Sequence, residues 1–277
     1  MENKKRKHDN VPHSEDVNKA TRNDSCELLD ALKDTKLWSS RRDLIRLIGS
    51  NKNADEQIIK GLVMHLKDKK PAVRVSVAEA LGELSHHSED LITTILLQLL
   101  ESYDGTPHSI GFSFEKVTCQ RNKDFVDHWL KIISTVSSLL RSSAQPNIRR
   151  CCIEVLGGIM TAITMRASIK HHYLIESKIT PIVIDYTNDD DELVRMSAAD
   201  VLGRVTGDKM DAISALVKML EKNDTCSVQL KIVSSVGKIG MPLSDRVREL
   251  LENVTPNHKN LKTLANKILN QKYIVVS

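Results

Sequence analysis

Apolar residues recur along this chain at the spacing of a helix. The stretches "PAVRVSVAEALGEL" at 71–84 and "ELVRMSAADVLGRV" at 192–205 carry apolar side chains at matching positions, and each has an arginine near its start. Residues three, four and seven positions apart share one face of an α-helix. The pattern therefore predicts two related amphipathic helices.

The same phrase occurs five times when the chain is aligned on a glycine. These glycines are Gly49, Gly82, Gly157, Gly203 and Gly237. An apolar residue precedes each one, and the residues eight positions before them are Arg41, Arg74, Arg149, Arg195 and Gln229. Successive glycines lie 33, 75, 46 and 34 residues apart, and the long step leaves room for one degenerate unit.

A second apolar segment lies between most of these glycines, at 58–68, 91–101, 213–224 and 245–254. Each unit then consists of two helices, and one such hairpin cannot bury its apolar face alone. Units must stack on their neighbours to form a core. We predict an all-α fold, an α-solenoid of stacked helical hairpins.

The residues of the best unit resemble HEAT repeats of the short type found in phycobilin lyases. Pro181, Asp189, Val194 and Arg195 stand at the offsets of that pattern, and Asp68, Val73 and Arg74 match three of the four positions. The resemblance implies a structural ladder of ion partners between neighbouring turns. It places Asp68, Arg74, Asp189 and Arg195 in this ladder, with interruptions at Ser143 and Gln229.

The chain divides into a polar tail and one repeat array. Residues 1–24 lack periodicity and predict a disordered tail, in which Lys4, Lys5, Arg6 and Lys7 resemble a short nuclear import signal. We expect residues 25–277 to form a single solenoid. A segment at about 102–124 breaks the repeat and predicts an inserted loop.

Composition narrows the class of protein. The net charge of +4 is spread along the chain, and the five cysteines show no CxxC spacing. We expect reduced cysteines in a cytoplasmic, possibly nuclear, protein that is a monomer and has no membrane partner. The longest apolar run is too short to cross a bilayer.

Candidate chemistry is sparse. The pairs His86-His87 and His171-His172 point in different directions on a helix, and the acidic run at 189–192 suits a ladder position and a helix N-terminus. No phosphate loop, nucleophile elbow or Cys-His arrangement stands out. The sequence also lacks the His-Glu dipeptides of deoxyhypusine hydroxylase, an iron enzyme built from similar repeats. We therefore predict no catalytic residues, no metal and no cofactor.

One stripe of polar residues remains on the second helix of each unit, turned away from the core. In HEAT arrays these helices line the concave surface, so the resemblance implies a partner-binding groove. Its predicted contact residues run from acidic in the middle to basic at the C-terminal end: Arg46, Glu79, Glu83, Glu154, Asp200, Arg204, Lys231 and Lys238.

This stripe favours a non-enzymatic scaffold that binds a partner protein by complementary charge. Nucleic-acid binding is a first alternative, since the tail and the C-terminal end of the stripe are basic. A bilin-lyase-like enzyme is a second alternative, although a shared repeat transfers no catalytic residue.

Overall fold

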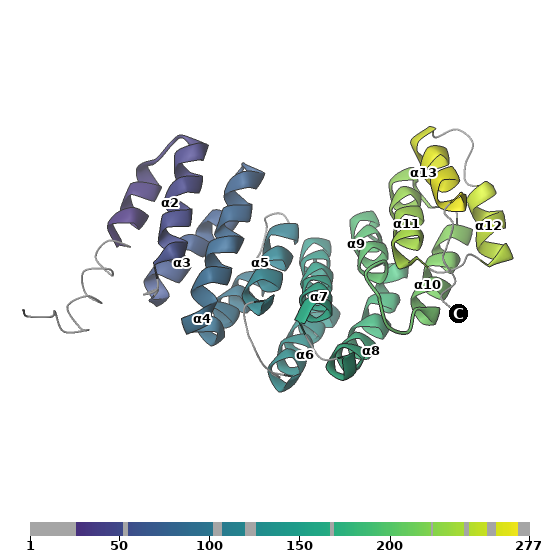
Figure 1. Ribbon diagram of the computed structural model, residues 1–277, viewed down its shortest axis with the longest axis horizontal. Coiled ribbons are helices and arrows are strands. Elements are labelled where there is room, and N and C mark those ends of the chain that lie inside the picture. The colour runs from purple at the N-terminus through teal and green to yellow at the C-terminus, as the bar shows by residue number, and fades with distance from the viewer. Residues whose placement is uncertain are drawn as a thin grey trace, which may run out of the picture.

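The computed structural model describes residues 26–51, 55–101, 107–119, 126–166, 169–222, 224–240, 244–253 and 259–270. All regular secondary structure in these ranges is helical (Figure 1). The chain begins there with a helix over 26–34. The predicted tail and its basic residues 4–7 lie outside the described residues. No helix in the described ranges is both long and apolar enough to span a membrane.

The helices form two layers. An inner layer contains helices that each pack on the next along the array: α2 (Trp38–Ser50), α4 (Pro71–Glu101), α5 (Pro107–Cys119), α7 (Pro146–Arg166), α9 (Glu192–Leu202), α11 (Cys226–Ile239) and α13 (Lys259–Leu269). The outer layer contains α3 (Glu56–Met64), α6 (Val126–Ser142), α8 (Ile169–Asp185), α10 (Met210–Glu221) and α12 (Asp245–Glu252). Short 3₁₀ turns at His65–Lys67 and Tyr186–Asn188 follow α3 and α8.

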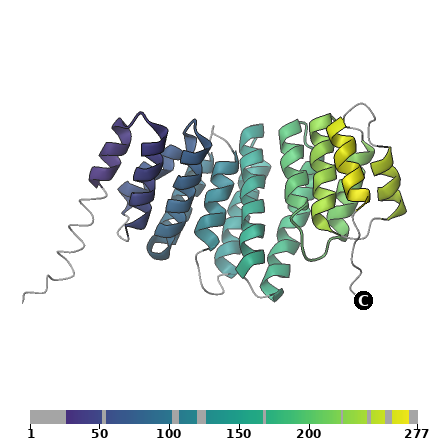
Figure 2. The same cartoon turned by 45° about the horizontal axis from the view of Figure 1, so that its top comes forward.

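The array is curved, and its two ends rise on the side of the inner layer (Figures 1 and 2). The inner helices therefore line the concave side. This arrangement confirms the predicted all-α solenoid of stacked hairpins. The apolar residues that precede the repeat glycines are all buried, as the periodicity predicts: Ile48, Leu81, Leu156, Leu202 and Val236.

The prediction of an inserted loop at 102–124 is wrong for its central part. Residues 107–119 form α5, which packs between α4 and α7 in the inner layer. Ile110, Phe114 and Val117 are fully buried at helical spacing and tie α5 to the core. Pro107 suits the first position of this helix, because proline lacks the N–H that would be unpaired there.

A common register explains why α5 was missed. Pro71, Pro107 and Pro146 each begin an inner helix, and Pro71 and Pro146 stand eleven residues before a repeat glycine. The same count from Pro107 reaches Thr118, so threonine occupies the glycine position of this unit. The 75-residue step therefore contains one whole additional repeat.

α4 also differs from the predicted pair of separate helices. It runs as one helix from Pro71 to Glu101, since neither glycine nor proline occurs between Leu84 and Leu91 to end it. Its second half leaves the inner layer, and Leu97 and Leu100 lie beside Leu139 of α6. This half of α4 is the outer helix of the unit that contains α5.

Glycine allows neighbouring inner helices to approach closely. A Cβ atom at Gly49 would lie 2.7 Å from the Cα atom of Ala80, and one at Gly158 would lie 2.5 Å from the carbonyl oxygen of Gly111. Both separations are too short for a side chain. The α5–α7 contact in the centre of the array is therefore made through backbone at its narrowest point.

Cys151 and Cys152 belong to this core. Both side chains are fully buried, and burial raises the pKa of each thiol to about 12. Neither forms a disulfide. They are packing residues of α7.

Candidate functional site

Arginine–aspartate pairs connect successive units at the start of the inner helices. Arg41 pairs with Asp68 at 2.8 Å, Arg149 with Asp189 at 2.7 Å and Arg195 with Asp224 at 2.6 Å. Each arginine uses two nitrogens on the carboxylate of the following unit. Burial favours the neutral form of Asp189, but the Arg149 hydrogen bonds and charge hold the pKa of Asp189 below its usual range.

Arg74 donates to the carbonyl oxygen six residues before it, as the ladder arginines Arg149 and Arg195 do. Arg74 Nε donates to the hydroxyl of Ser109 at 2.9 Å, and Nη1 donates to the carbonyl oxygen of Asp68 at 2.7 Å. Within the described ranges, Arg74 thus bonds neutral oxygens rather than a carboxylate. The ladder position of the next unit, residue 104, lies outside them. That unit carries Ile110 where four other units have arginine, so Ser143 faces no ladder arginine.

Five of the eight predicted partner-contact residues come together in one network on the concave side. Asp200 is its centre, with Oδ2 at 2.7 Å from Arg204 and Oδ1 at 2.9 Å from Lys238 and 3.2 Å from Lys231. Ser197 donates its hydroxyl hydrogen to Glu154 at 2.7 Å, and Arg204 lies 3.8 Å from the other oxygen of Glu154.

The electrostatics of Asp200 follow from this geometry. Burial by itself would raise the pKa of Asp200. The hydrogen bonds from Arg204 and Lys238, together with the charge of Lys231, more than offset burial and hold the pKa well below its usual range. Asp200 is therefore ionised at all ordinary pH values.

The network corrects the predicted charge gradient. Glu154 and Asp200 are only 3% and 7% exposed. Their carboxylates therefore bind groups of this chain and are not accessible to a partner. Three cations meet two carboxylates, which cancels most of the basic character of Arg204, Lys231 and Lys238.

The other three predicted residues lie elsewhere on the inner layer. Arg46 is exposed on α2, Glu83 is exposed on α4, and Glu79 is half-buried one turn before Glu83. Neither glutamate has an ion-pair partner within the described ranges. Net negative charge thus remains on α4, outside the neutralised centre.

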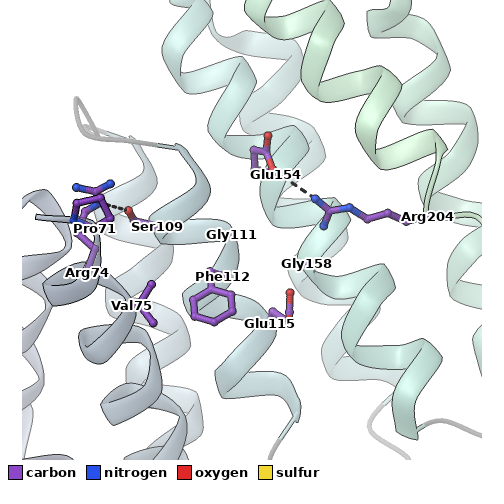
Figure 3. Close-up of a pocket in the computed structure, with 10 residues that line it drawn as sticks. All are labelled: Pro71, Arg74, Val75, Ser109, Gly111, Phe112, Glu115, Glu154, Gly158 and Arg204. Carbon is purple, nitrogen blue, oxygen red and sulfur yellow. Dashed lines mark hydrogen bonds and ion pairs between the residues drawn. The ribbon is translucent and has the colours of Figure 1, made fainter. Parts of the chain in front are cut away.

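A pocket of about 320 Å³ opens beside these glutamates, lined by α4, α5, α7 and the residues at the end of α9 (Figure 3). Its lining residues come from inner helices or their ends, so it opens on the concave side. Val75 and Phe112 form an apolar wall, and Glu115 and Arg204 stand at the opposite edge. Burial raises the pKa of Glu115, opposed by the charges of Lys116 and Arg204.

Sequence reasoning missed this pocket. Val75 is 42% exposed and stands seven residues before the repeat glycine, where the other units have Arg42, Arg150, Met196 and Leu230. Because this column is mixed, it gave no signal for the pocket. Phe112 could not be placed, because its segment was assigned to a loop.

A second polar cluster has a structural role. Glu176 is buried in α8 and accepts the backbone N–H groups of Thr206 and Gly207 at 2.6 and 2.7 Å. His172 lies 3.6 Å from the same carboxylate and 2.9 Å from the Thr206 hydroxyl. These contacts fix the turn between α9 and α10. The described residues hold no group of three or more potential metal ligands.

Comparison with known proteins agrees with this architecture. The family model described as HEAT repeat matches residues 58–88, which extend from α3 into the first half of α4. These residues form a HEAT repeat. The match covers the unit that contains Asp68 and Arg74, two residues on which the resemblance was based. No curated protein matches the chain at significant similarity.

Several solved structures are similar to the chain at low identity. An engineered protein is 16% identical over 76% of this chain and 96% of its own, with a TM-score of 0.44. A designed armadillo repeat protein in complex with the peptide (KR)4 is 14% identical, over 88% and 98%, with a TM-score of 0.43. The CpcE–CpcF complex of phycocyanin lyase from Nostoc is 16% identical, over 97% and 92%, with a TM-score of 0.38. No residue of this chain takes a role from these structures.

Proposed function

We propose that this HEAT-repeat chain is a non-catalytic scaffold that binds a partner protein along its concave face. The observation that carries the proposal is the pocket at α4, α5, α7 and the end of α9, which is lined on the concave side by exposed Val75 and half-buried Phe112. Interaction sites on soluble proteins combine such apolar centres with a charged rim. Arg204 and Glu115 supply that rim.

The side chains at the pocket favour binding over catalysis. Arg74 and Arg204 are held by hydrogen bonds to neighbouring side chains and backbone. A catalytic site would bring a nucleophile and a base within hydrogen-bond distance. The contacts of Arg74 and Arg204 are structural, so they lend no support to the lyase alternative.

The nucleic-acid alternative is weakened by the Asp200 network. Lys231 and Lys238 were its concave cations, and both are paired with Asp200. Binding to phosphates would have to compete with these ion pairs. A cytoplasmic or nuclear location and a monomeric state remain predictions.

The test selects ligands for the full-length protein from a library of displayed random peptides. Binding of the selected peptides is then measured to the wild type, to Val75→Asp and to Met64→Asp. Val75 and Met64 are both exposed apolar residues, at 42% and 67%, but Met64 lies on the outer helix α3. The aspartate at position 75 would place a charge against the apolar part of the ligand.

We expect Val75→Asp to weaken binding at least tenfold and Met64→Asp to leave it unchanged. Circular dichroism of both variants shows whether the helices are retained. Peptides that bind Val75→Asp as tightly as the wild type would refute binding on the concave face.

A further inference from the structure

We infer that the pocket at α4 and α5 receives one apolar side chain of an extended partner segment, with Lys or Arg residues beside it contacting Glu79 and Glu83. This inference rests on the proposed function and specifies the chemistry of the partner. It follows from the shape of the pocket, the unbalanced charge on α4 and the spacing of three α4 residues.

The pocket suits one aliphatic or aromatic side chain. Val75 and Phe112 provide apolar surface, and Gly111 and Gly158 contribute backbone to the lining (Figure 3). The volume of about 320 Å³ exceeds that of any single side chain and leaves room for the neighbouring backbone. Lys116 lies over the Phe112 ring at 4.8 Å and helps to hold this ring in place.

The charge on α4 determines which partner residues can lie beside that apolar side chain. Val75, Glu79 and Glu83 follow each other at four-residue intervals and so lie on one face of α4. Glu115 of α5 adds a carboxylate at the edge of the pocket. Arg204 is paired with Asp200, whereas Arg74 and Lys116 keep positive charge near the pocket, so the negative charge that meets a ligand lies further along α4, at Glu79 and Glu83.

The spacing of these residues favours a defined register. Successive residues of the α4 row are separated by about one helical turn, roughly 5.4–6 Å. Every second residue of an extended chain lies on the same side, at about 6.6–6.8 Å intervals. A segment that runs along α4 can therefore place an apolar residue over Val75 and basic residues two and four positions further over Glu79 and Glu83.

The test uses three fluorescent peptides with Gly-Ser flanks and the full-length protein. The basic probe contains Leu-Ser-Lys-Ser-Lys, the acidic probe Leu-Ser-Glu-Ser-Glu, and the third probe Gly-Ser-Lys-Ser-Lys. Fluorescence anisotropy at about 0.1 M salt reports their affinities. We expect the basic probe to bind at least tenfold more tightly than either of the others.

Two double variants separate local charge from total charge. Glu79→Lys/Glu83→Lys should abolish the preference for the basic probe and favour the acidic one. Asp211→Lys/Glu252→Lys makes the same change in net charge on the outer helices α10 and α12, where both side chains are exposed. This control should keep the wild-type order of affinities.

Acidic peptides that bind as well as basic ones, or a basic probe that does not bind at about 1 mM protein, would overturn the inference. The display selection distinguishes this failure from failure of the proposed function. Selected peptides that are sensitive to Val75→Asp but rich in Glu and Asp leave concave binding intact and refute the basic partner. Selected peptides that bind Val75→Asp as tightly as the wild type refute both the proposed function and the basic partner.

Discussion

Replacing Asp200 with asparagine tests whether the concave network stabilises the array. Asp200→Asn keeps the size of the side chain but removes the charge shared by Arg204, Lys231 and Lys238. Breaking a fully buried ion pair costs about 3–5 kcal/mol. The three cations here are 26%, 33% and 48% exposed, so water takes up part of the loss, and we expect about 2 kcal/mol.

The pH dependence of this loss has a definite sign. The pKa of Asp200 is lower in the folded chain than in the unfolded chain, where it is about 3.9. The stability that its charge contributes is therefore fully present above about pH 4–5 and is lost as pH falls toward the folded-state pKa. The difference between wild type and Asp200→Asn should be constant from pH 6 to 8 and should shrink below about pH 4.

Urea unfolding followed by circular dichroism at several pH values measures this difference. Lys238→Ala is the control, because its side chain is 48% exposed and leaves Asp200 with two cations. We expect it to cost less than about 1 kcal/mol. An Asp200→Asn variant as stable as the wild type at pH 7, or a loss that persists unchanged at pH 3, would refute the assigned role of the network.

Three further changes address other contacts of the array. Leu81→Asp should unfold the adjoining units, because it buries an unpaired charge at a fully buried position, and a wild-type melting curve would contradict the assigned core. Gly158→Ala should cost about 1–3 kcal/mol in chemical denaturation, since its Cβ would lie 2.5 Å from the carbonyl oxygen of Gly111; unchanged stability would show that α5 and α7 separate easily. Arg149→Ala should destabilise the array by about 1–3 kcal/mol more than Arg42→Ala, because only Arg149 pairs with a buried carboxylate, and equal denaturation midpoints would remove the ladder from the stabilising contacts.

The sequence predicted the buried columns of the array because burial and helical periodicity depend on the same residues. Leu81 and Leu202 occupy the position before the repeat glycine, which is apolar in all five aligned units, and both are fully buried. α5 was missed because recognition depended on the glycine, which Thr118 replaces. Pro107, at the same distance before that position as Pro71 and Pro146, was the signal that remained.

The charged network could not be predicted because its pairs join different units. Asp200 near the end of α9 and Arg204 in the turn that follows form a local pair four residues apart. Their contacts with Lys231 and Glu154 depend on how closely α7, α9 and α11 pack, which the spacing along the chain does not specify. The sequence therefore predicted a charged groove, whereas the fold pairs most of these charges with each other.

The charges on α4 differ from those of the Asp200 network, because they are not neutralised in the same way. Where Glu154 and Asp200 stand three residues before their repeat glycines, cations of the same or the next unit reach them. Glu79 occupies the same position in its unit, but the following helix, α5, offers Glu115 at the equivalent column. Glu79 and Glu83 have no ion pair within the described residues, so this face of α4 keeps their negative charge. It lies beside the pocket lined by Val75 and Phe112, and a ligand with both apolar and basic groups is the one that satisfies the two features together.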